Sequence, residues 1–219
     1  MTMIKKNKGK IILTSIIILL PILIGLILWG KLPDELPTHW NAEGVVDGWS
    51  NKGFAVFGLP LFLFAVHWVC LLATNADPKK QNHADKIVSM VLWICPIVSI
   101  TMLVFVYGTA LGMEFKVDKI MLILMGLMFI IIGNYLPKCK QNYTMGIKLP
   151  WTLNDEENWN RTHRMSGKLW VVTGVVTMLC MFLPANIMVV VFIVILFVAV
   201  MVPTIYSYRL HRNKMKSGE

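Results

Sequence analysis

The stretch that decides the fold is IILTSIIILLPILIGLILWG, residues 11–30, which follows lysines at positions 5, 6, 8 and 10. About 20 apolar residues are enough for a helix to cross a bilayer. A secretory signal peptide also begins with basic residues, but its apolar region is shorter and a small-residue cleavage site follows it. Here the sequence continues with Lys31, so we predict an uncleaved membrane anchor.

Five further apolar runs follow, and none shows the alternation expected of barrel strands. Because hydrocarbon offers no partner to backbone N–H and C=O groups, each run is expected to form a helix. The chain is 56% hydrophobic and only 15% charged, whereas soluble domains are about 25% charged. We predict an all-α integral membrane protein, one polytopic domain over residues 1–219. Its six spans are 11–30, 53–73, 87–111, 120–136, 169–183 and 187–208.

The basic residues fall on one side of this topology. Seventeen of the 21 Lys and Arg lie in the N-terminus, the 74–86 and 137–168 loops and the C-terminus. Positive charge marks the cytoplasmic side, so both termini are predicted to be cytoplasmic. The formal net charge of +9 is thereby explained by topology and by contact with anionic lipid. Direct nucleic-acid binding is not expected.

The cysteines and histidines indicate no cofactor. None of Cys70, Cys95, Cys139 and Cys180 lies in a predicted outer loop, so no extracellular disulfide is expected. No CxxC motif or His/Cys cluster suggests zinc. We therefore predict a protein without metal or other cofactor.

The predicted outer loop, residues 31–52, holds two prolines four apart that make it extended and stiff. Gly44 and Gly48 supply turns, and Trp40 and Trp49 suit the headgroup level. One hypothesis is a rigid platform that recognises an external ligand, and a weaker one is a metal site formed by His39, Glu43 and Asp47. The alternative is a loop anchored at the interface whose polar groups only satisfy turns.

The predicted inner loop, residues 137–168, contains a helix start at Asn154, whose side chain can cap the acidic first turn that follows. We expect a short helix to about Met165, lying along the membrane surface before span five. It would place Trp159 and His163 one turn apart on one face. Such a helix would either dock a cytoplasmic partner or simply orient span five.

Two runs of the sequence carry a resemblance. The first is Pro-Thr-His-Trp-Asn-x-x-Gly-x-x-Asp-Gly-Trp, residues 37–49, and the second is Thr-Met-Gly-Ile-Lys-x-Pro-Trp-Thr-Leu with Glu-x-x-Trp-x-x-Thr-His-Arg-x-x-Gly, within residues 144–167. They resemble the extracellular and cytoplasmic signatures of the SdpI family. The resemblance extends over nearly the whole chain. One departure is Lys148-Leu149, where family members more often have Arg-Thr, so the bidentate arginine fork is lost.

The resemblance implies an immunity protein of the bacterial cell membrane that gives resistance to a secreted peptide toxin of the sporulation-delay type. In the best-known case such a protein also holds a transcriptional repressor at the membrane. By the same resemblance, the ligand-facing outer loop would use His39, Trp40, Asn41, Gly44, Asp47 and Gly48. The inner partner or signalling element would use Gly146, Pro150, Trp151, Thr152, Trp159, His163 and Arg164.

Two other classes of function were weighed. A small transporter or exporter would need an ionisable group inside the membrane, and the one found well inside a span is His67, near the inner end of span two. An intramembrane enzyme is not favoured, because His39 and His163 are predicted on opposite sides of the membrane. The sequence also lacks HExxH and GxSxG motifs.

Overall fold

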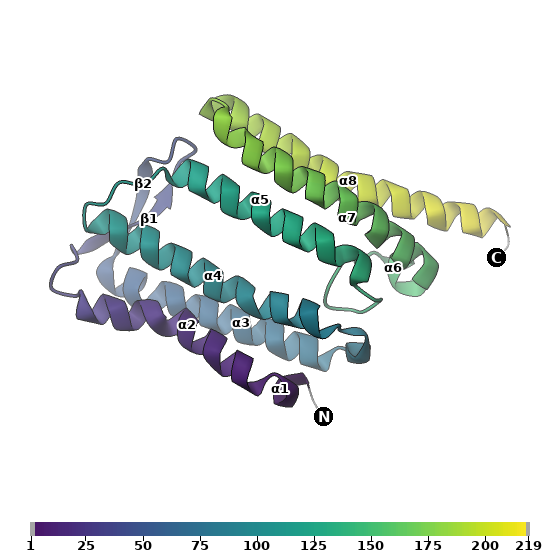
Figure 1. Cartoon of the computed structure of the whole chain (residues 1–219), viewed down its shortest axis with the longest axis horizontal. Coiled ribbons are helices and arrows are strands. Elements are labelled where there is room, and N and C mark those ends of the chain that lie inside the picture. The colour runs from purple at the N-terminus through teal and green to yellow at the C-terminus, as the bar shows by residue number, and fades with distance from the viewer. Residues whose placement is uncertain (1–2, 218–219) are drawn as a thin grey trace. The chain divides into compact units, whose positions relative to one another are not determined.

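The computed structural model of the chain describes residues 3–217, and contacts divide it into two compact units. The first unit comprises residues up to Ala76 and Val88–Asp118, and the second comprises Asp77–Ile87 and the residues from Lys119 on. Six helices in the described part are long and apolar enough to cross a membrane, which confirms the six predicted spans (Figure 1). The single polytopic domain over residues 1–219 stays a prediction.

The first unit is built from helices and one β-hairpin. Its elements are α1 (Met3–Lys6), α2 (Lys8–Ile27), β1 (Glu35–Trp40), β2 (Val46–Asn51), a π-helical turn (Phe54–Gly58), α3 (Leu59–Ala76) and most of α4 (Asp85–Ala110). The buried core of this unit joins the hairpin to the helices, since Leu36 of β1 packs in one cluster with Val56 and with Val106 and Tyr107 of α4. The hairpin is therefore fixed to the end of the helices.

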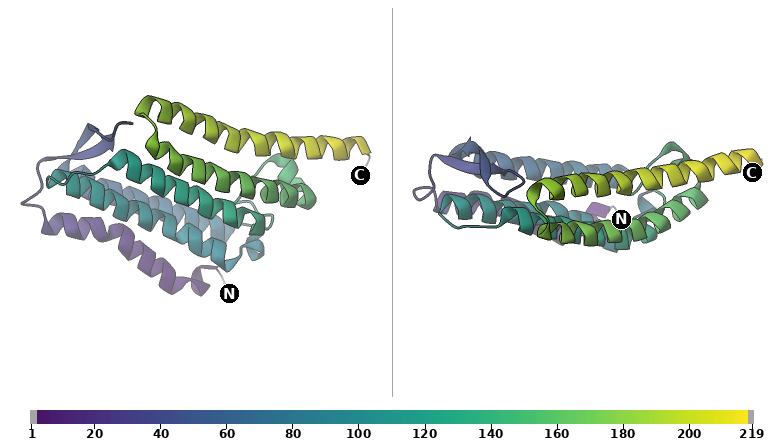
Figure 2. Two further views of the ribbon diagram at one scale, coloured as in Figure 1. Left: turned by 45° about the horizontal axis from the view of Figure 1, so that its top comes forward. Right: turned by 90° about the horizontal axis from the view of Figure 1, so that it is seen from above.

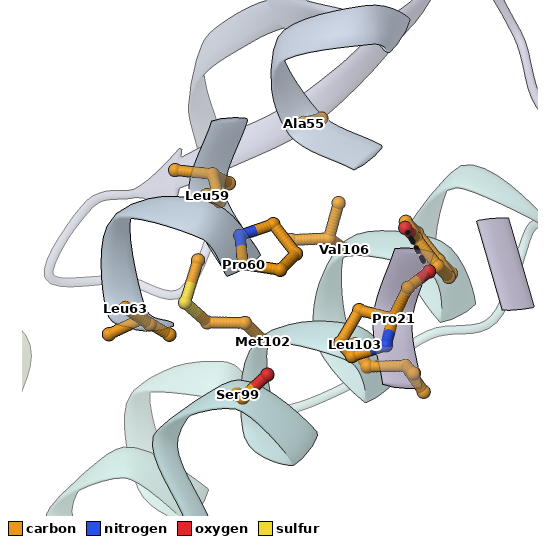
Figure 3. Close-up of a pocket in the computed structure, with 10 residues that line it drawn as sticks. Pro21, Ala55, Leu59, Pro60, Leu63, Ser99, Met102, Leu103 and Val106 are labelled. Carbon is orange, nitrogen blue, oxygen red and sulfur yellow. Dashed lines mark hydrogen bonds between the residues drawn. The ribbon is translucent and has the colours of Figure 1, made fainter. Parts of the chain in front are cut away.

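Pro21 interrupts the hydrogen-bond ladder of α2, because proline has no N–H to donate. Two side chains of α4 bond the carbonyls beside this break. The Tyr107 hydroxyl donates to the Pro21 carbonyl oxygen at 2.9 Å (Figure 3). The Ser99 hydroxyl donates to the Ile18 carbonyl oxygen at 2.8 Å. Neighbouring side chains thus bond backbone groups near a proline, as membrane helices require.

The hairpin is a structural element that the sequence did not predict. The 31–52 loop was expected to be extended and stiff, and β1 is extended, but it pairs antiparallel with β2 in a two-stranded sheet. The pattern was missed because Pro37 lies inside β1 and the register shifts on both sides of His39. Both features obscure the alternation by which a strand is normally found.

The second unit contains α5 (Val117–Tyr135, from Lys119), α6 (Pro150–Asn154), α7 (Glu156–Leu179) and α8 (Ala185–Ser217). Three 3₁₀ turns complete it, at Lys80–Asn82, Leu136–Lys138 and Cys180–Phe182. The tight connection between α7 and α8 makes them an antiparallel pair, and both views of Figure 2 show them running alongside each other. At about 1.5 Å per residue, the 33 residues of α8 span about 50 Å, longer than the bilayer core of about 30 Å.

The separate surface helix predicted before span five does not exist. Residues 156–165 are instead the first turns of α7, which continues unbroken into the spanning segment. Because α7 is one continuous helix, residues 156–165 do not form a separate surface helix, and this expectation was wrong. The predicted cap at Asn154 was also wrong, since Asn154 ends α6. The cap is Asp155, whose side chain accepts from the N–H groups of Glu157 and Asn158.

Four glycines set the distance between α5 and α7. Gly126 and Gly133 lie seven residues apart on α5 and face Gly174 and Gly167, also seven apart, on α7. A Cβ added at Gly133 would lie 2.7 Å from the Gly167 carbonyl oxygen, and one at Gly126 would lie 2.6 Å from that of Gly174. The two backbones therefore touch directly, a packing that small residues allow in membrane helices.

We expect Gly133→Ala to destabilise the protein, because the obstacle is backbone and cannot move aside. Overpacking of this kind costs about 1–3 kcal/mol. The control is Gly9→Ala, since a Cβ at Gly9 meets nothing within 4 Å. Thermal unfolding in nanodiscs would measure both variants. A midpoint for Gly133→Ala equal to that of Gly9→Ala would contradict the close packing of the two helices.

Candidate functional site

The turn of the hairpin is shaped by Asn41 and Gly44, two of the predicted outer residues. The Asn41 side-chain oxygen accepts from the N–H groups of Glu43 at 3.1 Å and Val45 at 2.9 Å. Gly44 has a φ of +75°, a conformation that glycine adopts without strain. The Asn41 side chain and Gly44 thus define the backbone of the turn, and the Glu43 side chain is left exposed.

His39 and Asp47 form an exposed pair on the two strands. The His39 Nδ1 lies 2.5 Å from the Asp47 Oδ1, and the two side chains are 70% and 44% exposed. The register shift beside His39 re-aims side chains, as bulges do, and brings the two together. Gly48 lies opposite His39, where an added Cβ would be 2.8 Å from the His39 Cβ. A side chain at position 48 would therefore push His39 away from Asp47.

Glu43 does not join this pair, and no group of three His, Cys, Asp or Glu side chains that could hold a metal occurs within residues 3–217. The two tryptophans of the hairpin also differ. Trp40 packs against the core of the first unit and has its ring 6.3 Å from that of Phe105. Trp49 is 56% exposed. The hairpin is thus anchored through Trp40 and presents Trp49 outward.

The helices of the first unit leave a small hollow lined by Pro21, Pro60, Ser99, Met102 and other apolar residues (Figure 3). Its volume is about 10 Å³, close to the minimum for one water molecule. It has no room for a substrate as it stands. His67 lies elsewhere in this unit, where its buried Nε2 is 3.3 Å from the Thr14 hydroxyl.

The centre of the inner loop is a stack of Trp159 on His163, with ring centroids 4.0 Å apart and planes inclined by 22°. Both side chains are buried. His163 Nε2 accepts from the Ile147 N–H at 2.9 Å, and Nδ1 lies 2.8 Å from the Trp159 carbonyl oxygen. Because one partner is a donor and the other an acceptor, the imidazole must be neutral with its proton on Nδ1. Trp159 in turn donates its indole N–H to the Cys139 carbonyl oxygen at 2.7 Å.

Gly146 lies against the edges of both rings of this stack. Its φ is +106°, and an added Cβ would collide with the His163 imidazole and lie 3.1 Å from the Trp159 ring. Glycine is therefore required here for two reasons, the left-handed backbone and the aromatic rings beside it. The two stacked rings, Gly146 and the Ile147 N–H therefore form one packed cluster.

Thr152 holds the chain before α6. Its hydroxyl accepts from the Leu149 N–H at 2.9 Å and lies 2.8 Å from the Ile147 carbonyl oxygen, to which it donates. The Gln141 amide donates to the Thr152 carbonyl oxygen at 2.9 Å. Pro150 is the first residue of α6, where a missing N–H does no harm.

Trp151 connects α6 to α8. Its indole N–H donates to the Ser207 hydroxyl at 2.9 Å, and its ring stacks against His211 at 6.1 Å. Asn158 on α7 donates to the Ser207 carbonyl oxygen at 2.9 Å. A polar groove of about 350 Å³ lies beside these contacts, between the first turns of α7 and the last turns of α8. It is lined by Asp155, Glu157, Asn158, Arg161, Leu210, Asn213, Lys214 and Ser217.

The structure thus brings Gly146, Thr152, Trp159 and His163 together, and Trp151 turns from them to α8. Arg164 is apart from them, on the exposed side of α7. The functional roles predicted for the outer and inner residues stay predictions. What their geometry adds is a contrast, since the outer pair is exposed and the inner stack is buried.

Sequence reasoning missed the acidic residue that fixes the inner loop. The Asp77 carboxylate is fully buried and accepts from the N–H groups of Lys79 and Tyr143 and from the Thr144 hydroxyl, at 2.7–2.9 Å. His83 Nε2 lies 3.1 Å away. Burial by itself would raise the pKa of Asp77, but the three hydrogen bonds and His83 hold that pKa below its ordinary value of 3.8. A lone carboxylate directly after a span was the signal that could have revealed it.

Asn142 completes the inner loop from within and was also missed. It is 1% exposed, and its side-chain oxygen accepts from the N–H groups of Thr144 at 2.9 Å and Met145 at 2.6 Å. Its amide donates to the Lys140 carbonyl oxygen at 2.8 Å. The irregular backbone of residues 139–149 is therefore satisfied largely by buried side chains.

The fold and the two candidate sites define a class of protein, a polytopic α-helical membrane protein. Its helices are joined by two ordered structures, the β1–β2 hairpin and the inner loop. Residues 138–207 match the SdpI/YfhL protein family, and residues 16–64 match a domain of unknown function, DUF1648. The immunity protein SdpI of Bacillus subtilis (strain 168) is 28% identical over 217 residues, covering 95% of this chain and 97% of that protein. No solved structure matches. These matches agree with the resemblance to the SdpI family that the loop signatures indicated, and the chain is a multi-pass protein of the cell membrane.

We expect the order of the inner loop to depend on pH through Asp77. Because its pKa is lowered in the folded protein, the stabilisation is present above the unfolded pKa of about 4 and is lost as pH falls through the folded value. The protection factors of residues 139–149 in nanodiscs, which compare the measured exchange with its intrinsic rate at each pH, should therefore fall in acid. Asp77→Asn should exchange faster at neutral pH and lose most of the acid dependence. An unchanged acid profile in Asp77→Asn would exclude Asp77 as the cause.

Gly146→Ala should destabilise the inner loop by more than backbone strain alone. The matched control is Gly112→Ala, since Gly112 has a similar φ of +85° but nothing within 4 Å of an added Cβ. Both variants carry a left-handed strain of about 1–2 kcal/mol, and Gly146→Ala adds an overpacking cost of about 1–3 kcal/mol. Equal unfolding midpoints for the two variants would show that the Trp159 and His163 rings move aside without a loss of stability.

Proposed function

We propose that this protein gives the cell that carries it resistance to a secreted antimicrobial peptide toxin of the sporulation-delay type. The observation that carries the proposal is the match to the immunity protein SdpI over 95% of this chain and 97% of that protein. A match of that extent includes both loop structures as well as the helices. The paired loop signatures of the sequence support the same function.

The hairpin is the part we assign to toxin contact. Its exposed groups include His39, Asp47 and Trp49, which offer a bonded histidine–carboxylate pair and an indole. Aromatic side chains next to a few polar groups are the usual composition of a binding surface. The anchoring of β1 in the core holds this surface in one shape, which lowers the entropy lost on binding.

We propose that the inner end of the second unit acts as a signal receptor that holds a cytoplasmic partner, such as a transcriptional repressor. The polar groove between α7 and α8 supports this role, because it is a solvent-facing cleft lined by both signs of charge. Asp155 bonds Lys214 at 3.1 Å across the two helices, and Arg161 bonds Glu157 at 3.2 Å. Charged groups at such a surface would select the partner.

We propose no catalytic step for this protein. A general base needs a free lone pair within reach of a substrate, and both ring nitrogens of His163 are bonded to the backbone. His39 is accessible, but its bonded partner is the Asp47 carboxylate, so the pair does not hold a hydroxyl or thiol that the imidazole could activate. A role in binding and in loop structure is enough to explain His39 and His163, so no catalytic turnover is assigned to them.

We expect expression of the protein in a toxin-sensitive bacterium to raise survival when a sporulation-delay-type peptide is added. His39→Ala should lower that protection roughly tenfold in toxin concentration, as the loss of about 1.4 kcal/mol of contact energy would do. Survival would be compared with an empty vector at equal membrane levels of protein.

Glu114→Ala serves as the control, since Glu114 is exposed in the other predicted outer loop. Full protection by Glu114→Ala with loss in His39→Ala would support the hairpin as the contact. Full protection by His39→Ala would show that the toxin contacts another part of the protein. No protection by the wild-type protein would rule out immunity to this toxin.

A further inference from the structure

The hydrogen-bond register of the hairpin shows which backbone groups face its partner strand. The Lys52 N–H donates to the Asp34 carbonyl oxygen at 2.8 Å, just beyond the ends of the two strands. Hydrogen-bonded and non-hydrogen-bonded pairs alternate along an antiparallel ladder. Two steps further along the register, Leu36 and Ser50 therefore form the next hydrogen-bonded pair.

The pairs between and beyond these, Glu35 with Asn51 and Pro37 with Trp49, turn their backbone groups away from the ladder. On β1 this outer edge is blunted, because Pro37 has no N–H and is buried. On β2 the edge is open. Within residues 3–217, no backbone group outside the hairpin is seen to bond to the backbone of Trp49 or to the Asn51 N–H. The Asn51 side-chain oxygen accepts from the Phe54 N–H at 2.8 Å, where the next helical segment begins.

The side chains around the open edge indicate what it would receive. Residues 35–51 contain three carboxylates and no Lys or Arg, and Glu35, Glu43 and Asp47 are all exposed. Val45 and Trp49 are 59% and 56% exposed. The surface thus combines negative charge with apolar groups, which is complementary to a strand that carries both basic and apolar side chains.

We propose that the open edge of β2 binds an extended, cationic peptide segment as a third strand of the sheet. The backbone N–H and C=O groups of Trp49 and Asn51 supply the hydrogen bonds, and the carboxylates and the Trp49 indole select the side chains. This mode rests on the proposed function, since it describes how the hairpin recognises a secreted peptide. A third strand also stabilises a two-stranded hairpin, which is marginal by itself.

The test uses the whole protein in nanodiscs of zwitterionic lipid and a short synthetic peptide that alternates lysine and valine. Trp49→Pro removes the outward N–H without touching a ladder bond, and Trp49→Thr removes the same indole but keeps the N–H. We expect Trp49→Pro to bind the peptide at least about tenfold more weakly than Trp49→Thr. A glutamate–valine peptide should not bind the wild-type protein.

Hydrogen exchange of the wild-type protein gives a readout that does not depend on the variants. Bound lysine–valine peptide should slow exchange of the Trp49 and Asn51 amides and leave the Ser50 amide unchanged. Equal binding by Trp49→Pro and Trp49→Thr, or no added protection at these amides, would overturn strand addition. Peptide binding without any protection in the survival assay would overturn the proposed function instead, so the two failures are distinguishable.

Discussion

The structure depends on a single constraint, that every backbone N–H and C=O shielded from water, in the membrane or inside a loop, needs a partner from the protein itself. The helices meet it internally, but the irregular segments cannot. The Asn142 side chain bonds two N–H groups of the inner loop, and Asp77 bonds a third, that of Tyr143, together with the N–H of Lys79 in its own connection. His163 bonds one N–H and one carbonyl oxygen. Polar side chains are buried here because the backbone of residues 139–149 has no ladder of its own.

The two loop structures solve this constraint in opposite ways. The hairpin satisfies one row of backbone groups within its ladder and leaves its side chains, such as His39 and Asp47, exposed. The inner loop is instead built around buried polar side chains, since Asn142, Thr152 and His163 are each at most 1% exposed. A surface made of side chains can be altered without loss of the fold, whereas a loop built around buried side chains cannot. The first arrangement suits recognition, and the second suits a fixed conformation.

Much of the fold could be predicted from the sequence, because length and hydropathy alone define a spanning helix. The pairing of Trp159 with His163 also followed from their spacing on a helix, and the structure confirms it. The hairpin could not be predicted, since Pro37 and two register shifts hide its strands.

The surface helix was predicted wrongly because acidic residues suggested a new start. They do mark a helix start, one residue later at Asp155, but that helix has no second end before Leu179. Asp77 was missed because two of its partners, Tyr143 and Thr144, lie more than 60 residues away.

The unbroken course of α7 has a mechanical consequence. Its 24 residues extend about 36 Å, from the connection to α8 at one end to the buried His163 stack and the capping Asp155 at the other. A helix without a break transmits rotation along its length, so it behaves as a lever. A tilt of about 10° about one end of α7 would displace the other end by about 6 Å. That displacement exceeds the length of any hydrogen bond between α7 and the inner loop, so a small reorientation within the membrane is enough to exchange one set of inner contacts for another.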